Sequence, residues 1–214
     1  MLFNSYAFIF GYLPVTLAGF FLLASSSHRL AALWLAAASL FFYGWWNPAF
    51  VALVMASITV NYGFGYVIGH ARIRSGKKAT TVLAVSVITN LGLLAYFKYA
   101  NFFIANVSQL TGAELSVVNI VLPLGISFFT FTQIAFLVDV YRGIAREYNF
   151  IHYVLFVTYF PHLIAGPVLH HKQMMPQFGH AGTYSVNLEN INIGLTIFII
   201  GLAKKVLLAD QFAL

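Results

Sequence analysis

Long apolar runs, separated by short connections that carry most of the charge, constrain the fold of this chain more than any other feature. A helix needs about 20 apolar residues to cross a bilayer, where every backbone polar group must be paired internally. Runs suited to this lie near residues 6–24, 30–46, 50–69, 80–97, 121–141, 150–167 and 191–208. Only 7% of the 214 residues are charged, against roughly a quarter in soluble domains. The sequence therefore predicts an all-α, polytopic integral membrane protein with about seven membrane segments, forming a single membrane domain over residues 1–214.

Three of these runs need a closer description. Segments 30–46 and 150–167 are short for a crossing, so we predict that they are tilted or re-entrant. The first run begins near the N-terminus, where Met1 to Leu23 has neither the basic region nor the small-residue cleavage pattern of a secretory signal. We therefore predict that it is a retained first span.

The distribution of Lys and Arg predicts the orientation in the membrane. With the N-terminus outside, nine basic residues fall on inner connections: Arg29, Arg72, Arg74, Lys77, Lys78, Arg142, Arg146, Lys204 and Lys205. Only Lys98 and Lys172 then fall on outer connections. Because basic residues concentrate on cytoplasmic loops, this asymmetry predicts a periplasmic N-terminus.

Several function classes are excluded or disfavoured by the residues that are present. The chain has no cysteine, so disulfides, thiolate metal sites and a cysteine nucleophile within it are excluded. The basic residues form no stripe with interleaved aromatics outside the apolar runs, which argues against nucleic-acid binding. Phosphate loops, dinucleotide fingerprints and paired carboxylates are also missing from the sequence.

The stretch Tyr159–Val168 places a histidine and a Gly-Pro break inside otherwise membrane-grade sequence. Pro161, Gly166 and Pro167 free backbone groups that lipid cannot satisfy, which predicts a cavity or a re-entrant segment. His162 is the sharpest candidate for chemistry, because a neutral imidazole can act as a general base and is cheaper to bury than a carboxylate. The alternatives for His162 are cavity lining, substrate contact, or a hydrogen bond to a neighbouring helix.

Asp139 and Arg142 lie at the inner end of the fifth apolar run. Their i, i+3 spacing allows an ion pair on one helical face, and an Asp at a membrane boundary needs such a partner. Structural pairing is the favoured role, with contact to an acyl donor as the alternative.

Four amides lie inside apolar runs and need internal partners. Such residues commonly hydrogen-bond between helices, so we expect them to hold the bundle together. They are Asn61, Asn90, Gln133 and Asn192.

Two connections carry patterns of their own. Residues 98–110 combine apolar and amide side chains, which suggests an interfacial amphipathic helix. Residues 169–190 form the most polar stretch and are expected to be an exposed or funnel-lining loop. His170, His171 and His180 within it lack a familiar metal-ligand spacing, so we expect no metal and a solvated loop.

Six ordered segments together resemble the membrane-bound O-acyltransferase family, in particular the bacterial branch that includes the alginate O-acetylation membrane subunit. Any one of them would be weak evidence, but together they extend over nearly the whole chain. They are Phe41–Pro48, Tyr96–Phe103, Leu122–Phe131, Leu137–Gly143, Phe160–Pro167 and Gly201–Val206.

The resemblance implies a multi-pass protein of the bacterial inner membrane whose helices surround a funnel. It implies transfer of an acyl group, commonly acetyl, from a cytoplasmic donor such as acetyl-CoA to an envelope polysaccharide such as alginate. Membrane lipid, the acyl donor, the polysaccharide and a periplasmic acetyltransferase are the expected partners, and no bound cofactor is expected. The residues expected to contact substrate or line the funnel are Asp139, Arg142, His162, Gly166, Pro167 and Lys172.

The chain also departs from the family pattern. Family members are substantially longer, and their catalytic histidine follows a Gly-Leu-Trp-His-type segment that has no match here. We therefore expect this chain to be the N-terminal half of an acyltransferase, inactive alone, with its catalytic histidine beyond Leu214. His162 is only a weak catalytic candidate. The alternatives from other classes are a non-catalytic scaffold or channel component that docks a periplasmic partner through residues 169–190, and a small transporter.

Overall fold

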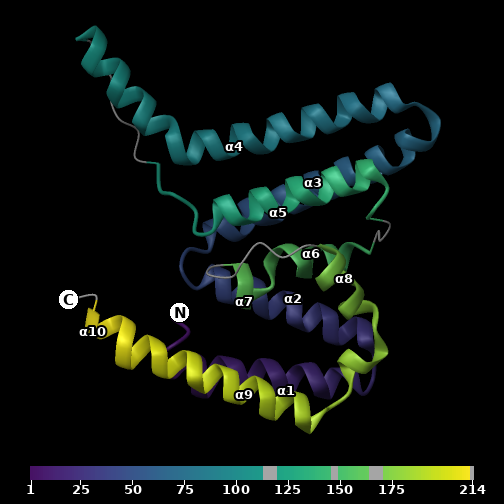
Figure 1. The fold of residues 1–214 in the computed structure, drawn as a ribbon, viewed down its shortest axis with the longest axis vertical. Helices are drawn as coiled ribbons and strands as arrows, with labels where there is room; N and C mark the ends of the chain where they lie inside the picture. Colours follow the sequence, from purple (N-terminus) through teal and green to yellow (C-terminus); the bar gives the residue numbers. More distant parts are fainter. Residues whose placement is uncertain (113–119, 146–148, 164–170, 213–214) are drawn as a thin grey trace. The chain divides into compact units, whose positions relative to one another are not determined.

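The computed structural model describes residues 1–112, 120–145, 149–163 and 171–212, and every element in these ranges is helical (Figure 1). The all-α prediction is therefore confirmed. The elements are η1 (Ala7–Tyr12), α1 (Leu13–Ala24), α2 (His28–Gly44), α3 (Ala49–Arg74), α4 (Gly76–Thr111), α5 (Ile126–Arg142), α6 (Phe150–Thr158), α7 (Phe160–Leu163), α8 (His171–Gly179), η2 (Ala181–Tyr184), α9 (Leu188–Ala203), η3 (Lys204–Ala209) and α10 (Asp210–Phe212).

Four continuous helical stretches among the described residues are long and apolar enough to cross a membrane. They are Ala7–Ala24, Ala49–Arg74, Gly76–Thr111 and Leu188–Phe212. Helices α2 and α5 have 17 residues each, which gives a length of about 25 Å at 1.5 Å per residue. A polytopic membrane protein is thus confirmed, whereas the predicted number of seven segments stays a prediction.

The chain divides into two compact units, and the first comprises residues 1–38 together with the described residues from His180 onward. In this unit the indole Nε1 of Trp34 on α2 donates a hydrogen bond to the Thr16 carbonyl on α1 at 3.0 Å. Tyr12 donates its hydroxyl hydrogen to the Ala38 carbonyl at 2.9 Å. Tyr12 pairs with Ala38, whereas the later Thr16 pairs with the earlier Trp34. Helix α1 and the first part of α2 are therefore antiparallel.

The second unit, residues 39–179, is built around α3, α4 and α5. Asn61 on α3 and Asn90 on α4 exchange amide hydrogen bonds of 2.6 and 3.1 Å. Gln133 on α5 donates to the Ser57 hydroxyl on α3 at 3.0 Å and accepts from the Tyr153 hydroxyl on α6 at 3.4 Å. All five side chains are buried, and their polar atoms pair with one another. This confirms the predicted helix-joining role of Asn61, Asn90 and Gln133.

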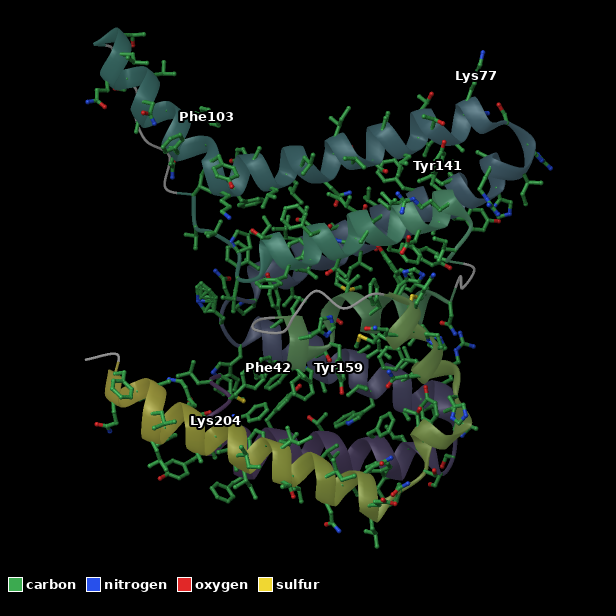
Figure 2. The ribbon with its side chains drawn as sticks, in the orientation of Figure 1. Phe42, Lys77, Phe103, Tyr141, Tyr159 and Lys204 are labelled. Carbon is green, nitrogen blue, oxygen red and sulfur yellow. The ribbon has the colours of Figure 1, made fainter. Side chains whose placement is uncertain are left out.

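Two connections differ from the sequence-based expectation. Residues 98–110 are helical, but they continue α4 rather than forming a separate helix, and Figure 1 shows a bend in α4 ahead of its final turns. Phe103 is labelled on the portion beyond the bend in Figure 2. The expectation of a solvated loop over 169–190 is wrong for α8 and η2, because these helices bury His171 and Tyr184. Asn192 is exposed on α9, so its predicted pairing stays a prediction.

Candidate functional site

Three of the motif segments meet at the N-terminal end of α5. Gly125 caps this helix in the left-handed conformation, with φ of 70°, and a β-carbon on it would lie 2.8 Å from the Leu163 carbonyl oxygen. Tyr43 at the end of α2 donates its hydroxyl hydrogen to the Leu124 carbonyl at 3.0 Å. The rings of Phe42 and Phe160 pack with centroids 5.5 Å apart. Three short segments that are far apart in the sequence, around positions 42, 125 and 163, therefore pack together at this end of α5.

His162 is buried in this structure, with 8% of its surface exposed. Its Nε2 lies 3.0 Å from the Phe156 carbonyl oxygen, which can only accept a hydrogen bond. Nε2 therefore carries the hydrogen, and in the neutral ring Nδ1 holds a lone pair. Nδ1 is buried and has no hydrogen-bond partner among the described residues. A buried imidazole with an acceptor of this kind suits a ligand that presents a hydroxyl group.

Asp139 and His171 form a second buried polar contact in the same unit. The Oδ2 atom of Asp139, on α5, lies 3.1 Å from Nδ1 of His171, the first residue of α8. Both side chains are buried. A carboxylate at this distance favours the tautomer that carries its hydrogen on Nδ1.

Aromatic rings surround His171. The ring of Phe136 lies 5.9 Å from the His171 ring and that of Phe156 lies 6.4 Å from it, both edge-on. Phe136 also packs on Tyr153 at 4.7 Å. Because Gln133, Phe136 and Asp139 follow one another at three-residue intervals on α5, one helix face contacts both α6 and α8.

Sequence reasoning missed the burial of His171, although a signal for it exists. His171, Met174, Met175 and Phe178 follow the i, i+3, i+4, i+7 spacing of a buried helix face, and all four are buried. Arg142, the partner predicted for Asp139, is exposed at the end of α5, while His171 lies against the carboxylate. The Asp139–Arg142 pair itself stays a prediction.

The other predicted site residues are distributed as follows. Lys172 is exposed on α8. Gly166, Pro167 and His170 lie outside the described residues. His180 does not join a cluster of ligands: its Nδ1 accepts the Gly182 backbone hydrogen at 3.1 Å. Within the described ranges, no group of three or more His, Cys, Asp or Glu side chains is placed to hold a metal ion.

The fold and the site define an all-α membrane protein in which three of the motif segments gather buried polar groups in one helical unit. Comparison with known proteins identifies its family. The profile of the membrane-bound O-acyltransferase family matches residues 77–213. The chain belongs to this family, which confirms the resemblance read from its sequence.

Named relatives align with the whole chain. A peptidoglycan O-acetyltransferase of Helicobacter pylori is 38% identical over 240 aligned positions, which cover 100% of this chain and 45% of that protein. A probable alginate O-acetylase AlgI of Pseudomonas aeruginosa is 41% identical over 100% of this chain and 41% of its own length. The corresponding protein of Azotobacter vinelandii is 39% identical, with 42% of its length covered. The chain thus spans less than half the length of these relatives. No solved structure matches the chain.

Proposed function

We propose that this chain belongs to a membrane-bound O-acyltransferase that moves an acetyl group from a cytoplasmic thioester donor, such as acetyl-CoA, to a hydroxyl of a cell-envelope polysaccharide. The buried Nδ1 acceptor of His162, located where three motif segments meet, is the observation that carries this proposal. The names of the relatives support the reaction class and two kinds of acceptor, alginate and peptidoglycan.

In this proposal His162 binds the acceptor hydroxyl through Nδ1. The hydroxyl oxygen bonds to the acetyl carbonyl carbon, the bond between that carbon and the donor sulfur breaks, and the hydroxyl proton passes to the leaving thiolate. A donated hydrogen bond to Nδ1 orients the hydroxyl and increases electron density on its oxygen. Asp139, Arg142, Gly166, Pro167 and Lys172 are the further residues proposed to contact the substrates or line their route.

The location and partners follow from the same reasoning. We place the protein in the bacterial inner membrane with a periplasmic N-terminus, because basic residues are concentrated on connections between apolar helices. The acceptor polysaccharide lies outside the cell, which makes a periplasmic acetyltransferase a reasonable partner for completing the transfer. Membrane lipid is expected to cover the exposed apolar residues of α9, such as Ile197 and Ile199.

Replacing His162 by Gln in the chromosomal gene tests this function. The Gln side chain can still donate to the Phe156 carbonyl, but it has no acceptor at the position of Nδ1. We expect the acetate that mild alkali releases from envelope polysaccharide to fall at least about tenfold, because the acceptor hydroxyl loses the hydrogen bond that orients it. His70→Gln is the matched control, because His70 is an exposed histidine on α3. Undiminished ester acetate in His162→Gln cells, with equal protein in the membrane, would remove the basis of the proposal.

A further inference from the structure

Basic side chains from three helices gather at one end of the second unit. Arg72 and Arg74 lie in the last turn of α3, and Lys77 and Lys78 lie in the first turn of α4. Arg142 is the last residue of α5. All five residues are exposed, and we call them the basic cluster. Figure 2 shows Lys77 projecting outward from the start of α4.

Two contacts hold the end of α5 beside the turn between α3 and α4. The guanidinium group of Arg72 lies against Gly143, the residue that caps α5. The hydroxyl groups of Thr80 on α4 and Tyr141 on α5 are 2.9 Å apart and share a hydrogen bond. Arg142 lies between Tyr141 and Gly143 in the sequence, so its backbone is held next to the basic residues of the turn.

Among the described residues, no acidic side chain offsets the charge of the basic cluster. Asp139 is the only acidic residue of the second unit that the structure describes, and its buried carboxylate faces His171. None of the five cluster residues forms an ion pair with another described residue. Arg146 and Glu147 lie outside the described residues, and their formal charges cancel. The cluster is therefore a concentrated positive charge.

The position of the two lysines adds to the repulsion within the cluster. The first turn of a helix carries a partial positive charge, because its N–H groups have no partner within the helix. Ser75, the N-cap of α4, makes no side-chain hydrogen bond to these groups, and the first turn contains no acidic residue. Lys77 and Lys78 therefore add charge of the sign that this helix end disfavours. An anion bound at the cluster would relieve this repulsion.

The basic cluster also adjoins exposed apolar side chains. Helices α3 and α4 are both long and apolar enough to cross a membrane, and residues 72–78 connect them. Ile73 is 82% exposed between the two arginines, and Val67 on α3 and Val85 on α4 are exposed further along the same helices. A soluble phosphate compound would use only the charges of this surface, whereas a phospholipid would also cover its apolar part.

We propose that the basic cluster binds the phosphate groups of an anionic phospholipid, whose acyl chains lie along the exposed apolar residues of α3 and α4. Arginine donates paired hydrogen bonds to phosphate oxygens, and lysine supplies a point charge. A lipid with two phosphates, such as cardiolipin, suits cations drawn from three helices. The bound headgroup joins the end of α5 to the turn between α3 and α4. This inference does not depend on the proposed function.

The positive-inside rule gives another explanation for the same residues. Basic residues concentrate on cytoplasmic connections whether or not they bind a ligand. That rule requires the cluster residues to be on one side of the membrane, but it does not require Arg142 to lie beside the turn. It also predicts no saturable effect of an anionic lipid, so the two explanations give different experimental results.

Thermal unfolding of the full-length protein, purified in a neutral detergent, tests the proposal. Added cardiolipin is expected to raise the unfolding temperature by at least about 3 °C, in a saturable manner, because a ligand that binds only the folded state stabilises it. Zwitterionic phosphatidylethanolamine and inorganic pyrophosphate, at the same phosphate concentration, should give a smaller rise. An equal rise with phosphatidylethanolamine would show general solvation by lipid, and an equal rise with pyrophosphate would show a site for soluble phosphates. Either result would overturn the proposal.

Two matched double variants locate the lipid. Arg74→Gln with Lys78→Gln removes two charges from the cluster and keeps Arg72, which packs against Gly143. The control, Arg29→Gln with Lys98→Gln, removes two exposed charges elsewhere in the chain. We expect the rise caused by cardiolipin to fall by at least about half in the cluster variant and to stay unchanged in the control. Equal rises in the two variants would place the lipid at another surface.

Arg142→Gln tests whether α5 takes part in the site. Native mass spectrometry measures the bound fraction of cardiolipin without reference to unfolding. At a fixed cardiolipin concentration, this fraction is expected to fall at least about threefold in Arg142→Gln, because a charge-assisted hydrogen bond to phosphate is lost. The Arg29→Gln, Lys98→Gln control should bind as the unmodified protein does. Undiminished binding by Arg142→Gln would contradict a site formed by all three helices.

Discussion

The carbonyl oxygen of Leu163 occupies the space that a β-carbon on Gly125 would need, 2.8 Å from that position. This contact joins the segment before α5 to the segment that carries His162, although 38 positions separate them in the sequence. Glycine is required there for two reasons, since the residue also has φ of 70°. The geometry of the candidate site therefore depends on a residue that cannot itself take part in chemistry.

Substituting Gly125 by Ala is expected to destabilise the second unit. The left-handed conformation costs a residue with a β-carbon about 1–2 kcal/mol, and the clash with the Leu163 backbone adds to this. Thermal unfolding of the purified protein in detergent measures the loss. Gly92→Ala is the control, because a β-carbon on Gly92 would meet no atom within 4 Å. Equal unfolding temperatures for the two variants would contradict the contact.

Replacing Asn61 by Leu is expected to lower the free energy of unfolding by about 1–3 kcal/mol, because it leaves the buried amide of Asn90 without its partner. The double variant Asn61→Leu with Asn90→Leu should recover part of this loss, since no buried amide then remains unpaired. If the free energy of unfolding of the double variant falls by the sum of the two single losses, the two amides do not interact directly.

Asp139→Ala is expected to destabilise the protein by about 1–3 kcal/mol, because it removes the buried carboxylate that faces Nδ1 of His171. Asp139→Asn should lose less, because its carbonyl oxygen can still accept from Nδ1 of His171. The comparison of the two variants by denaturant unfolding isolates the hydrogen bond from the charge. If Asn were as harmful as Ala, the carboxylate charge rather than the hydrogen bond would dominate the pair.

Gly143→Ala is expected to disturb the end of α5. Gly143 has φ of 76°, and the guanidinium group of Arg72 lies where its β-carbon would be. Arg72→Ala in the same protein removes the collision but leaves the backbone strain of about 1–2 kcal/mol. Because the guanidinium is the far end of a flexible side chain and can move aside, the double variant should be no more stable than Gly143→Ala alone. A clear gain in the stability of the double variant would show instead that the guanidinium is held in place.

Much of the fold could be predicted from the sequence, since runs of apolar residues report helices and membrane spans directly. The partners of Asn61, Asn90 and Gln133 were also predictable in kind, because a buried amide in an apolar run must find an internal hydrogen bond. The identity of each partner was not, because it depends on how α3, α4 and α5 are turned toward one another.

The contacts of the described residues on either side of 164–170 could not be predicted from the sequence. Leu163 lies against Gly125, and His171 lies against Asp139. Each contact depends on how α7 and α8 are placed against α5, which the composition of an apolar run does not specify. His171 escaped notice because its neighbour His170 and Lys172 gave the segment a polar appearance, which hid the helical spacing of Met174, Met175 and Phe178.

Transfer of acetyl from acetyl-CoA by host membranes tests the central claim most directly. Membranes from cells with the intact gene and from cells lacking it are incubated with labelled acetyl-CoA and the host's envelope polysaccharide. The account predicts alkali-labile label on the polysaccharide only with the intact gene, restored when the gene is returned. Equal labelling of the polysaccharide by both membrane preparations would contradict an O-acyltransferase function for this protein.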